Sequence, residues 1–236
     1  MFEWSMAALV TFFAALVQGV IGFGLGVVSV PILTLLDPVF TPIPQLMMSV
    51  PLAFGTAFRE WTDVDKAGIG WVTLGRLPGA IAGTWLLTRI SDDVLGVVIG
   101  VIVLAAVVVS NRGWYVPITR TSRLAAGVTA GFTGTTSGIG GPPIALLYRR
   151  SRPEEARSTV GALLAIGLFV NLAVLGTAGA IEQSDIDVSL RLVVPALAGF
   201  GASSLVKGRV DAGRFRAGVL VVSGAAAGAL VLRSFF

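Results

Sequence analysis

The sequence of 236 residues contains no cysteine and no histidine. Without cysteine there is no disulfide bond and no thiolate metal site. Without histidine there is no Ser-His or Cys-His nucleophilic pair, no histidine-ligated metal and no histidine proton relay. Because these absences exclude most familiar catalytic centres, we expect no enzyme activity, no bound metal and no cofactor.

Charged residues are scarce as well. They make up 13% of the chain, whereas 55% of the residues are hydrophobic and the mean hydropathy is +0.88. A soluble domain could hardly cover its surface with so few charges, so the composition predicts an integral membrane protein with the lipid bilayer as a partner. The net charge of +4 falls on short connectors between apolar segments. This pattern is typical of membrane orientation and argues against a nucleic-acid partner.

Six apolar segments are long enough to cross about 30 Å of hydrocarbon as helices, which takes roughly 17 to 25 residues. They are 42–58, 68–88, 94–110, 158–180, 190–206 and 215–232. Two further apolar segments, 5–36 and 124–148, are interrupted by glycines and prolines, which break helices. We therefore predict an all-α integral membrane protein with six spanning helices and two broken helical segments.

The two broken segments resemble each other. A shift of 112 residues gives seven identities in 24 positions, among them Gly19 with Gly131, Gly22 with Gly134, Gly26 with Gly138 and Pro31 with Pro143. Each broken segment is followed by three of the predicted spanning helices. We interpret this as an internal duplication, with an N-terminal repeat in residues 1–112 and a C-terminal repeat in residues 113–236, together forming one membrane domain.

The positions of Lys and Arg indicate how the broken segments lie. If both cross the membrane fully, the basic residues outside the spans divide seven against nine between the two sides, whereas if both are re-entrant hairpins they divide three against thirteen. The cytoplasmic side of a membrane protein carries an excess of Lys and Arg, so the count favours hairpins with both termini outside. Three spans per repeat then make the two repeats inverted. Both hairpin tips are expected to meet near the midplane, because unwound backbone at that depth must be buried in protein or face a wet cavity.

Three motifs resemble the TauE/SafE family of sulfite exporters. The first is Gln18-Gly19-x-x-Gly22-Phe23-Gly24, closing on Pro31-Ile32-Leu33; the second is Gly134-Thr135-Thr136-Ser137-Gly138-x-Gly140-Gly141-Pro142-Pro143; the third is Arg76-Leu77-Pro78-Gly79, followed by Gly83. The likeness covers essentially the whole chain. It implies a multi-pass permease of the bacterial inner membrane that exports small anions such as sulfite or organosulfonates.

The two glycine-rich tips are the predicted substrate site. Each tip begins a helical limb whose unpaired N–H groups and positive dipole end would face an anion, and we expect Ser29 to cap the first limb and Gly141-Pro142 to open the second. Glycines let the backbone approach a ligand closely, and hydroxyl groups can bind oxyanion oxygens. The substrate-binding residues predicted from the tips are Gln18, Gly22, Gly24, Gly26, Thr135, Thr136, Ser137 and Gly138.

Two more candidates lie within predicted spans. Arg76 is the one charge deep inside a span, where a charge costs at least about 2.5 kcal/mol, so it either binds substrate or reaches towards the membrane surface. Asn171 lies midway along 158–180 and could bind substrate or join two helices. All thirteen carboxylates fall in tails, connectors or helix ends, so the sequence predicts no buried proton relay.

Other interpretations are open from sequence. The glycines could serve only close helix packing, and the hydroxyl groups could bond to their own helix. An anion channel or a uniporter is the alternative to a carrier with alternating access. The run Thr136-Ser137-Gly138 is similar to the serine motif of rhomboid proteases, but that motif needs glycine at the position of Thr135 and a histidine base. Glycine and alanine on the spanning faces would allow a homodimer.

Overall fold

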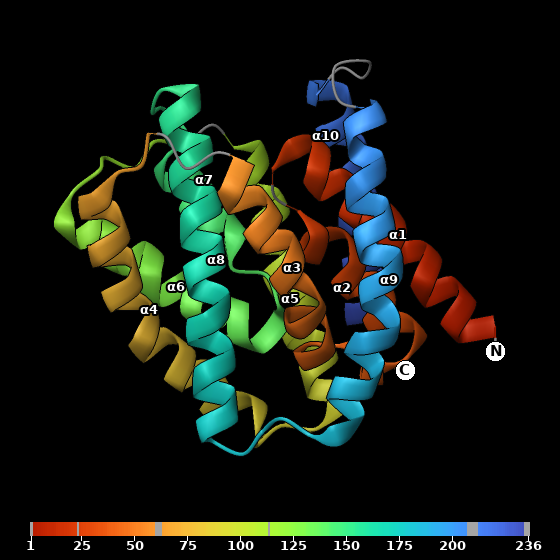
Figure 1. The fold of residues 1–236 in the computed structure, drawn as a ribbon. Helices are drawn as coiled ribbons and strands as arrows, with labels where there is room; N and C mark the ends of the chain where they lie inside the picture. The colour runs from red at the N-terminus through yellow and green to blue at the C-terminus, as the bar shows by residue number, and fades with distance from the viewer. Residues whose placement is uncertain (1, 23, 60–62, 113, 207–211, 234–236) are drawn as a thin grey trace.

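The computed structural model describes residues 2–22, 24–59, 63–112, 114–206 and 212–233, and only the backbone of 57–59 and 212–216 (Figure 1). These residues form helices and no strand. In chain order the elements are α1 (Phe2–Ile21), α2 (Leu25–Leu36), the 3-10 helix η1 (Pro38–Phe40), α3 (Ile43–Arg59), α4 (Lys66–Leu87), α5 (Asp92–Asn111), α6 (Arg120–Ser137), α7 (Gly141–Leu147), α8 (Pro153–Thr177), α9 (Gln183–Val206) and α10 (Ala212–Arg233).

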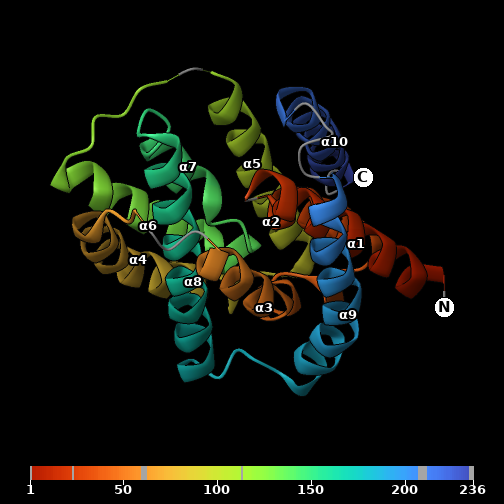
Figure 2. The same cartoon turned by 45° about the horizontal axis from the view of Figure 1, so that its top comes forward.

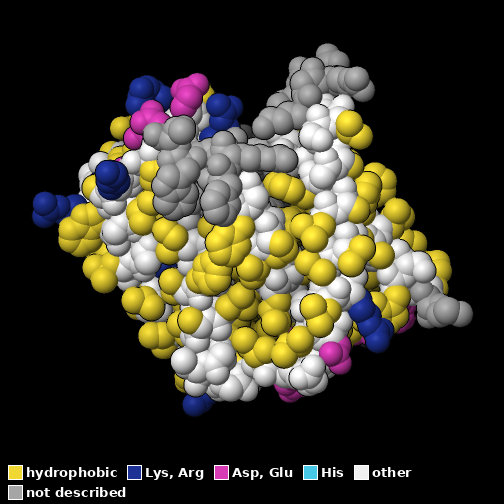
Figure 3. Space-filling view, viewed as in Figure 1, with side chains coloured by type: hydrophobic (Ala, Val, Ile, Leu, Met, Phe, Trp, Pro, Cys, Tyr) yellow, Lys and Arg dark blue, Asp and Glu magenta, His cyan; other side chains and the backbone are white. Residues whose placement is uncertain are grey.

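The predicted all-α fold is confirmed, and α3, α4, α5, α8, α9 and α10 lie where the six spanning segments were placed. Four helices in the described part of the chain, α1, α5, α8 and α9, are long and apolar enough to cross a membrane. Helix α4 has 22 residues but is less apolar, and α3 has 17. Figure 3 shows hydrophobic side chains across the middle of one face, with most of that face's charged side chains towards its upper and lower margins.

Each broken segment becomes a long helix and a short helix joined at glycines. Between α1 and α2, Gly22 and Gly24 have φ angles of 91° and 121°, and Gly138 ends α6 with a φ of 69°. Residues with a Cβ atom rarely adopt these angles, so glycine is needed at each turn. Helix α7 starts after Gly140, and Pro142 stands in its first turn as expected.

The expected cap at Ser29 is wrong. Helix α2 already begins at Leu25, directly after Gly24, so Ser29 lies inside the helix and its hydroxyl donates to the Leu25 carbonyl at 2.7 Å. Pro31 is also inside α2, whereas Pro143 is in the first turns of α7. The 112-residue shift therefore aligns α1 with α6, but it does not align equivalent positions of α2 and α7.

Both broken segments turn back towards the level at which they start. The Trp4 ring, at the start of α1, packs edge-on against Phe40, which follows α2, with ring centroids 5.1 Å apart. In the second segment, Tyr148 ends α7, and its hydroxyl donates at 3.0 Å to Asp65, which also pairs with Arg123 near the start of α6. Each pair of helices, α1–α2 and α6–α7, is therefore a hairpin.

The hairpins are held by very close helix contacts. Helix α4 packs along α6, and α1 packs along α9, on opposite sides of the molecule (Figures 1 and 2). At Gly79 of α4 a Cβ atom would overlap the Val128 carbonyl of α6, and at Gly199 of α9 one would overlap the Phe12 carbonyl of α1. The two contacts are reciprocal. The first helix of the C-terminal hairpin, α6, packs on α4 of the N-terminal half, and the first helix of the N-terminal hairpin, α1, packs on α9 of the C-terminal half. Small residues permit such backbone approach between membrane helices.

Candidate functional site

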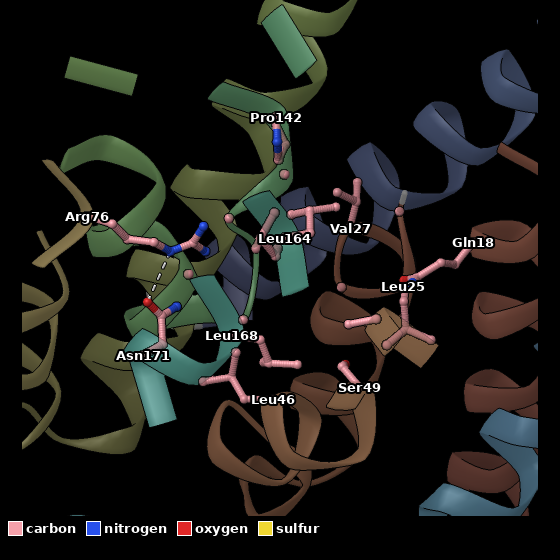
Figure 4. A pocket seen from close by; sticks show the side chains of 18 residues that line it. Gln18, Leu25, Val27, Leu46, Ser49, Arg76, Pro142, Leu164, Leu168 and Asn171 are labelled. Carbon is pink, nitrogen blue, oxygen red and sulfur yellow. Dashed lines mark hydrogen bonds between the residues drawn. The ribbon is translucent and has the colours of Figure 1, made fainter. Parts of the chain in front are cut away.

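A cavity of about 80 Å³ lies between the two hairpin tips (Figure 4). The first tip contributes Gly24 and Gly26 to its lining, and the second contributes Gly138 and Gly140. Side chains of α1, α3, α4 and α8 complete the wall. We refer to this space as the central cavity.

The tips also contact each other directly. A Cβ atom at Gly26 would lie 2.7 Å from the Gly138 carbonyl oxygen and 3.3 Å from the Ile139 side chain. Glycine is therefore required at position 26 for this approach, because real Cβ atoms are not found that close to a backbone oxygen. Gly26 thus serves packing between the tips, as the alternative interpretation held, and it also lines the central cavity.

Arg76 enters the central cavity from α4. The residue is 3% exposed, its Nε donates to Asn171 Oδ1 at 3.3 Å, and its Nη1 donates to the Leu163 carbonyl at 3.0 Å. Figure 4 shows the Arg76 and Asn171 side chains side by side, with the guanidinium turned towards the lumen. Arg76 is fully enclosed by protein and so does not reach towards the membrane surface.

Three glycines make room for the guanidinium. A Cβ atom at Gly167 of α8 would overlap it, one at Gly140 would lie 2.6 Å from Nη2, and one at Gly134 would lie 3.3 Å from Nη2. Sequence analysis missed Gly167 and did not select Gly134 or Gly140. The spacing could have indicated Gly167, since it lies four residues before Asn171, one turn away on the same helical face.

Among the residues that the structure describes, no carboxylate pairs with the charge of Arg76. The lining of the central cavity contains no Asp or Glu among the residues that the structure describes. Arg76 Nη2 and the buried Asn171 Nδ2 also have no hydrogen-bond partner in the described part of the chain. The cavity therefore presents a positive charge and two unused N–H donors, which is the arrangement that recognises an anion.

The structure brings together six of the ten residues predicted from sequence. Arg76, Asn171, Gln18, Gly24, Gly26 and Gly138 all line the central cavity. Gln18 enters from α1, on the wall opposite Arg76 (Figure 4). Gly22 does not line it and faces a neighbouring cavity instead.

The three predicted hydroxyl residues are buried but do not line the central cavity. Each donates to the carbonyl four residues earlier in α6: Thr135 to Gly131 at 2.9 Å, Thr136 to Phe132 at 2.8 Å and Ser137 to Thr133 at 2.6 Å. This is the local bonding that competes with ligand binding for such hydroxyls. Ser49 of α3, which sequence analysis did not select, does line the cavity, and its hydroxyl likewise donates to a carbonyl of its own helix, that of Gln45, at 2.6 Å.

A second polar cluster joins four helices at one end of the bundle. Asp65 caps α4 by accepting from Gly68 N–H at 2.9 Å, and it also accepts from Tyr148 at 3.0 Å and from Arg123 at 2.5 Å. Thr159 of α8 accepts from the Asp65 N–H at 3.0 Å. Burial raises the Asp65 pKa, but these hydrogen bonds and the Arg123 charge outweigh it, so the net pKa is lowered. Burial and the Asp65 carboxylate raise the pKa of Tyr148.

Residues 7–230 match the family model described as sulfite exporter TauE/SafE. The chain belongs to the TauE/SafE family. It is accordingly a multi-pass membrane transporter of the anion-exporter type. No curated protein and no solved structure matches the chain.

The three motifs that suggested TauE/SafE membership converge on the central cavity. The first motif supplies Gln18 and Gly24, the second supplies Gly138 and Pro142, and the third supplies Arg76. Segments up to 124 positions apart in the chain thus contribute to one small space, which is lined by the Arg76 guanidinium and by several glycines. A cavity of this chemistry suits the anionic cargo of the TauE/SafE family.

Proposed function

We propose that this chain is a carrier for sulfite or organosulfonates that binds one anion in the central cavity. The uncompensated guanidinium of Arg76 is the observation that supports this most strongly. Burying a charge without a partner costs several kcal/mol, by order of magnitude, and an anion in the cavity would offset that cost. Because Nη1 and Nε are already bonded to protein, Nη2 is the group that would meet the solute.

The donor arrangement fits a small oxyanion. Arg76 Nη2 and Asn171 Nδ2 both lie next to Gly134, so one solute with several oxygens can accept from both. Gln18 would add a side-chain amide from the opposite wall. A cavity of about 80 Å³ has room for one such anion and a few water molecules, not for a large organic substrate.

We further propose that the halves are inverted repeats and that movement between them alternates access to the cavity. The opposite directions of α3 and α8 in Figure 1 support inversion, as do the reciprocal contacts of α4 with α6 and of α9 with α1. Both hairpins would be re-entrant, both termini would lie outside, and the protein would reside in the bacterial inner membrane.

The test is solute flux in proteoliposomes with radiolabelled sulfite. We expect saturable uptake that unlabelled anion on the opposite side accelerates, which identifies a carrier. Arg76→Gln should reduce uptake at limiting concentration at least 30-fold, since hydrogen bonds to a charged group contribute about 1.5 to 3 kcal/mol each. Arg191→Gln is the matched control, because Arg191 stacks on Trp4 at 4.8 Å and neither residue lines the central cavity.

Two results would overturn the proposal. Equal uptake by the wild type and Arg76→Gln would place the site elsewhere. Uptake that shows no exchange and is accompanied by ohmic single-channel current would identify an anion channel in place of a carrier.

A further inference from the structure

An apolar groove of about 440 Å³ runs between α5 on one side and α6 and α7 on the other. Its lining is mostly aliphatic and includes Val101 of α5, Ala125 of α6 and Pro143 of α7. Val101 is 54% exposed and Ala125 is exposed as well, so the groove is open to the surroundings of the bundle. The hydroxyls of Thr129 and Thr133 in its wall donate to backbone carbonyls. The groove therefore suits an apolar ligand.

The groove has the depth of one bilayer leaflet. Its lining extends from Val101 to Val109 along α5 and from Ser122 to Thr133 along α6. At about 1.5 Å per residue these stretches are about 12 Å and about 16 Å long, and half of a hydrocarbon core is about 15 Å. The inner end lies at Ile139, in the second tip. The outer end, which we call the mouth, lies where residues 114–119 run from α5 to α6 (Figure 2).

Four arginines, which we call the mouth arginines, lie at this end of the groove. Arg112 follows α5, Arg120 begins α6, and Arg149 and Arg150 follow α7. Each is within three positions, along the chain, of a residue that lines the groove. All four are exposed, and none has an ion-pair partner among the described residues. Arg150 also lies over the ring of Tyr115, at 4.5 Å, and so joins the end of α7 to the connector between α5 and α6.

The helices that form the groove supply no negative charge to balance the mouth arginines. The sequence has no Asp or Glu in residues 94–153, which include α6, α7 and nearly all of α5. The two other arginines of this stretch, Arg123 and Arg152, pair with Asp65 and Asp63. Basic clusters at a membrane surface attract anionic headgroups, and basic pockets between helices bind phosphate groups of lipids. The mouth is therefore complementary in charge to an anionic phospholipid.

A second copy of the chain fits the groove less well than a lipid does. A two-fold interface brings the same surface of both copies together. The mouth arginines of the two copies would then face one another, and like charges repel. An anionic phospholipid instead brings a negative phosphate to the mouth and a flexible apolar chain to the groove.

We propose that the groove is a binding site for an anionic phospholipid. One acyl chain lies between α5 and the α6–α7 hairpin, and the phosphate lies at the mouth, where the mouth arginines supply the positive charge. The acyl chain packs against Ile139 and Pro142 and so supports the second hairpin from its outer side. The site is independent of the solute that the central cavity binds.

Quenching by brominated lipids tests the site where it lies, because the chain has no natural cysteine to label. Val101→Cys places a bimane fluorophore at the edge of the groove, and Val221→Cys places one on an exposed face of α10; both residues lie midway along their helices. The bilayers mix phosphatidylglycerol with phosphatidylcholine, and only one of the two carries bromine on its acyl chains. We expect phosphatidylglycerol to be favoured at least about five-fold at Val101→Cys and less than about two-fold at Val221→Cys. Equal preference at the two positions would overturn the proposal.

Two further changes test the charge and the groove separately. Replacing all four mouth arginines with Gln should reduce the preference at Val101→Cys to less than about two-fold, whereas replacing them with Lys should preserve it. Arg89→Gln, beyond the opposite end of α4 from Asp65, is the matched control and should change nothing.

Ala105→Phe fills the groove and leaves every charge in place, so it decides the question even where the neutralised protein does not fold. We expect it to abolish the preference for phosphatidylglycerol, because the acyl chain can no longer enter. A preference that survives Ala105→Phe would contradict the proposal. Weak quenching by both lipids, together with a disulfide between two copies of Val101→Cys, would assign the groove to a second copy of the chain.

Discussion

The two hairpin tips differ in how firmly they are built. In the first, a Cβ atom at Gly22 would meet nothing within 4 Å, and one at Gly24 would meet only Val17 at 3.7 Å. In the second, Thr133 Oγ1 donates to the Ile139 carbonyl at 2.7 Å, and the Ile139 N–H donates to the Thr133 carbonyl at 3.4 Å, so two bonds span the turn. The first tip is loosely surrounded, whereas the second is cross-linked within itself.

The difference matches a division of roles at the site. The second tip supplies Gly134 and Gly140, which make room for Arg76, and its far end is tied to α4 and α8 through Asp65. The first tip supplies Gly24, and Ile21 directly before it, to the lining of a small space of about 20 Å³ beside the central cavity. We therefore expect the second tip to hold the anion and the first tip to move when access to the cavity changes.

The largest expected effect comes from filling the room around Arg76. Gly140→Val should weaken sulfite binding at least 100-fold, because a Cβ atom there lies 2.6 Å from Nη2, and Gly140→Ala should show part of the loss. Gly22→Ala is the matched change in the first tip. It should cost about 1 kcal/mol of stability, since its φ is 91°, and should leave affinity within about three-fold.

Isothermal titration of sulfite into detergent-purified variants measures this contrast, with thermal melting to verify folding. If Gly22→Ala lost affinity as strongly as Gly140→Val, the two tips would contribute equally to binding and the comparison would fail.

Substitutions of Asn171 test how the neighbour of Arg76 affects anion binding. Asn171→Leu should weaken binding about ten-fold, since it removes one donor and leaves Arg76 Nε without its acceptor. Asn171→Asp should weaken it further, because the new carboxylate would neutralise the guanidinium and repel the anion. The same titration decides the order. Tighter binding by Asn171→Asp than by Asn171→Leu would show that charge balance at Arg76 does not govern affinity.

A change in pH tests whether the charge of Asp65 holds the second hairpin against α4 and α8. The folded-state pKa of Asp65 lies below its usual value of 3.8, so its stabilising contribution is complete well above that value and is lost as the pH falls through it. Asp65→Asn should lower the melting temperature by roughly 4 to 8 °C at pH 7, for about 2 kcal/mol of lost hydrogen bonding to charged groups.

The melting-temperature difference between the wild type and Asp65→Asn should stay constant from about pH 7 to 5 and shrink below about pH 4. Asp63→Asn is the matched control, because the Asp63–Arg152 pair is exposed and contributes little. A difference that does not change down to pH 3 would show that the Asp65 charge is not what ties the hairpin.

The smallest effects are expected from the hydroxyls of α6. Thr136→Val and Ser137→Ala should leave sulfite affinity within about two-fold, since both hydroxyls donate to carbonyls of their own helix and lie outside the cavity lining. A loss of ten-fold or more in either variant would mean that the second tip rotates these groups towards the solute when it binds.

Much of the fold follows from local sequence. Apolar runs bounded by glycine, proline and charged connectors set the positions of the six long helices, and dense glycine marks both tips. The residue at which each helix of the broken segments begins was harder to predict. Helix α2 begins directly after Gly24, and not after Ser29 as the sequence suggested. Several glycines lie close together at each break, and the sequence does not show which of them adopts the positive φ angle that ends or starts a helix.

The site was harder to predict because it depends on contacts between distant segments. Arg76 could be selected from its depth in a span, but its bond to Asn171, 95 positions away, depends on how α4 and α8 pack. Gly167 matters only because a guanidinium of another helix lies against it. The hydroxyls of Thr135 to Ser137 show the opposite difficulty, since a polar residue next to a tip has the same sequence pattern whether its hydroxyl faces a cavity or donates to its own helix, as it does in this structure.

The central claim is that an anion occupies the space between Arg76 and Asn171, and anomalous diffraction from crystals of the protein with selenite, the selenium analogue of sulfite, tests it most directly. The account predicts a selenium peak within about 4 Å of Arg76 Nη2 and Asn171 Nδ2, a distance set by hydrogen bonds of ordinary length to the selenite oxygens, and no peak at that position in Arg76→Gln. Selenium found only outside the central cavity, or a peak at the same place that persists in Arg76→Gln, would contradict it.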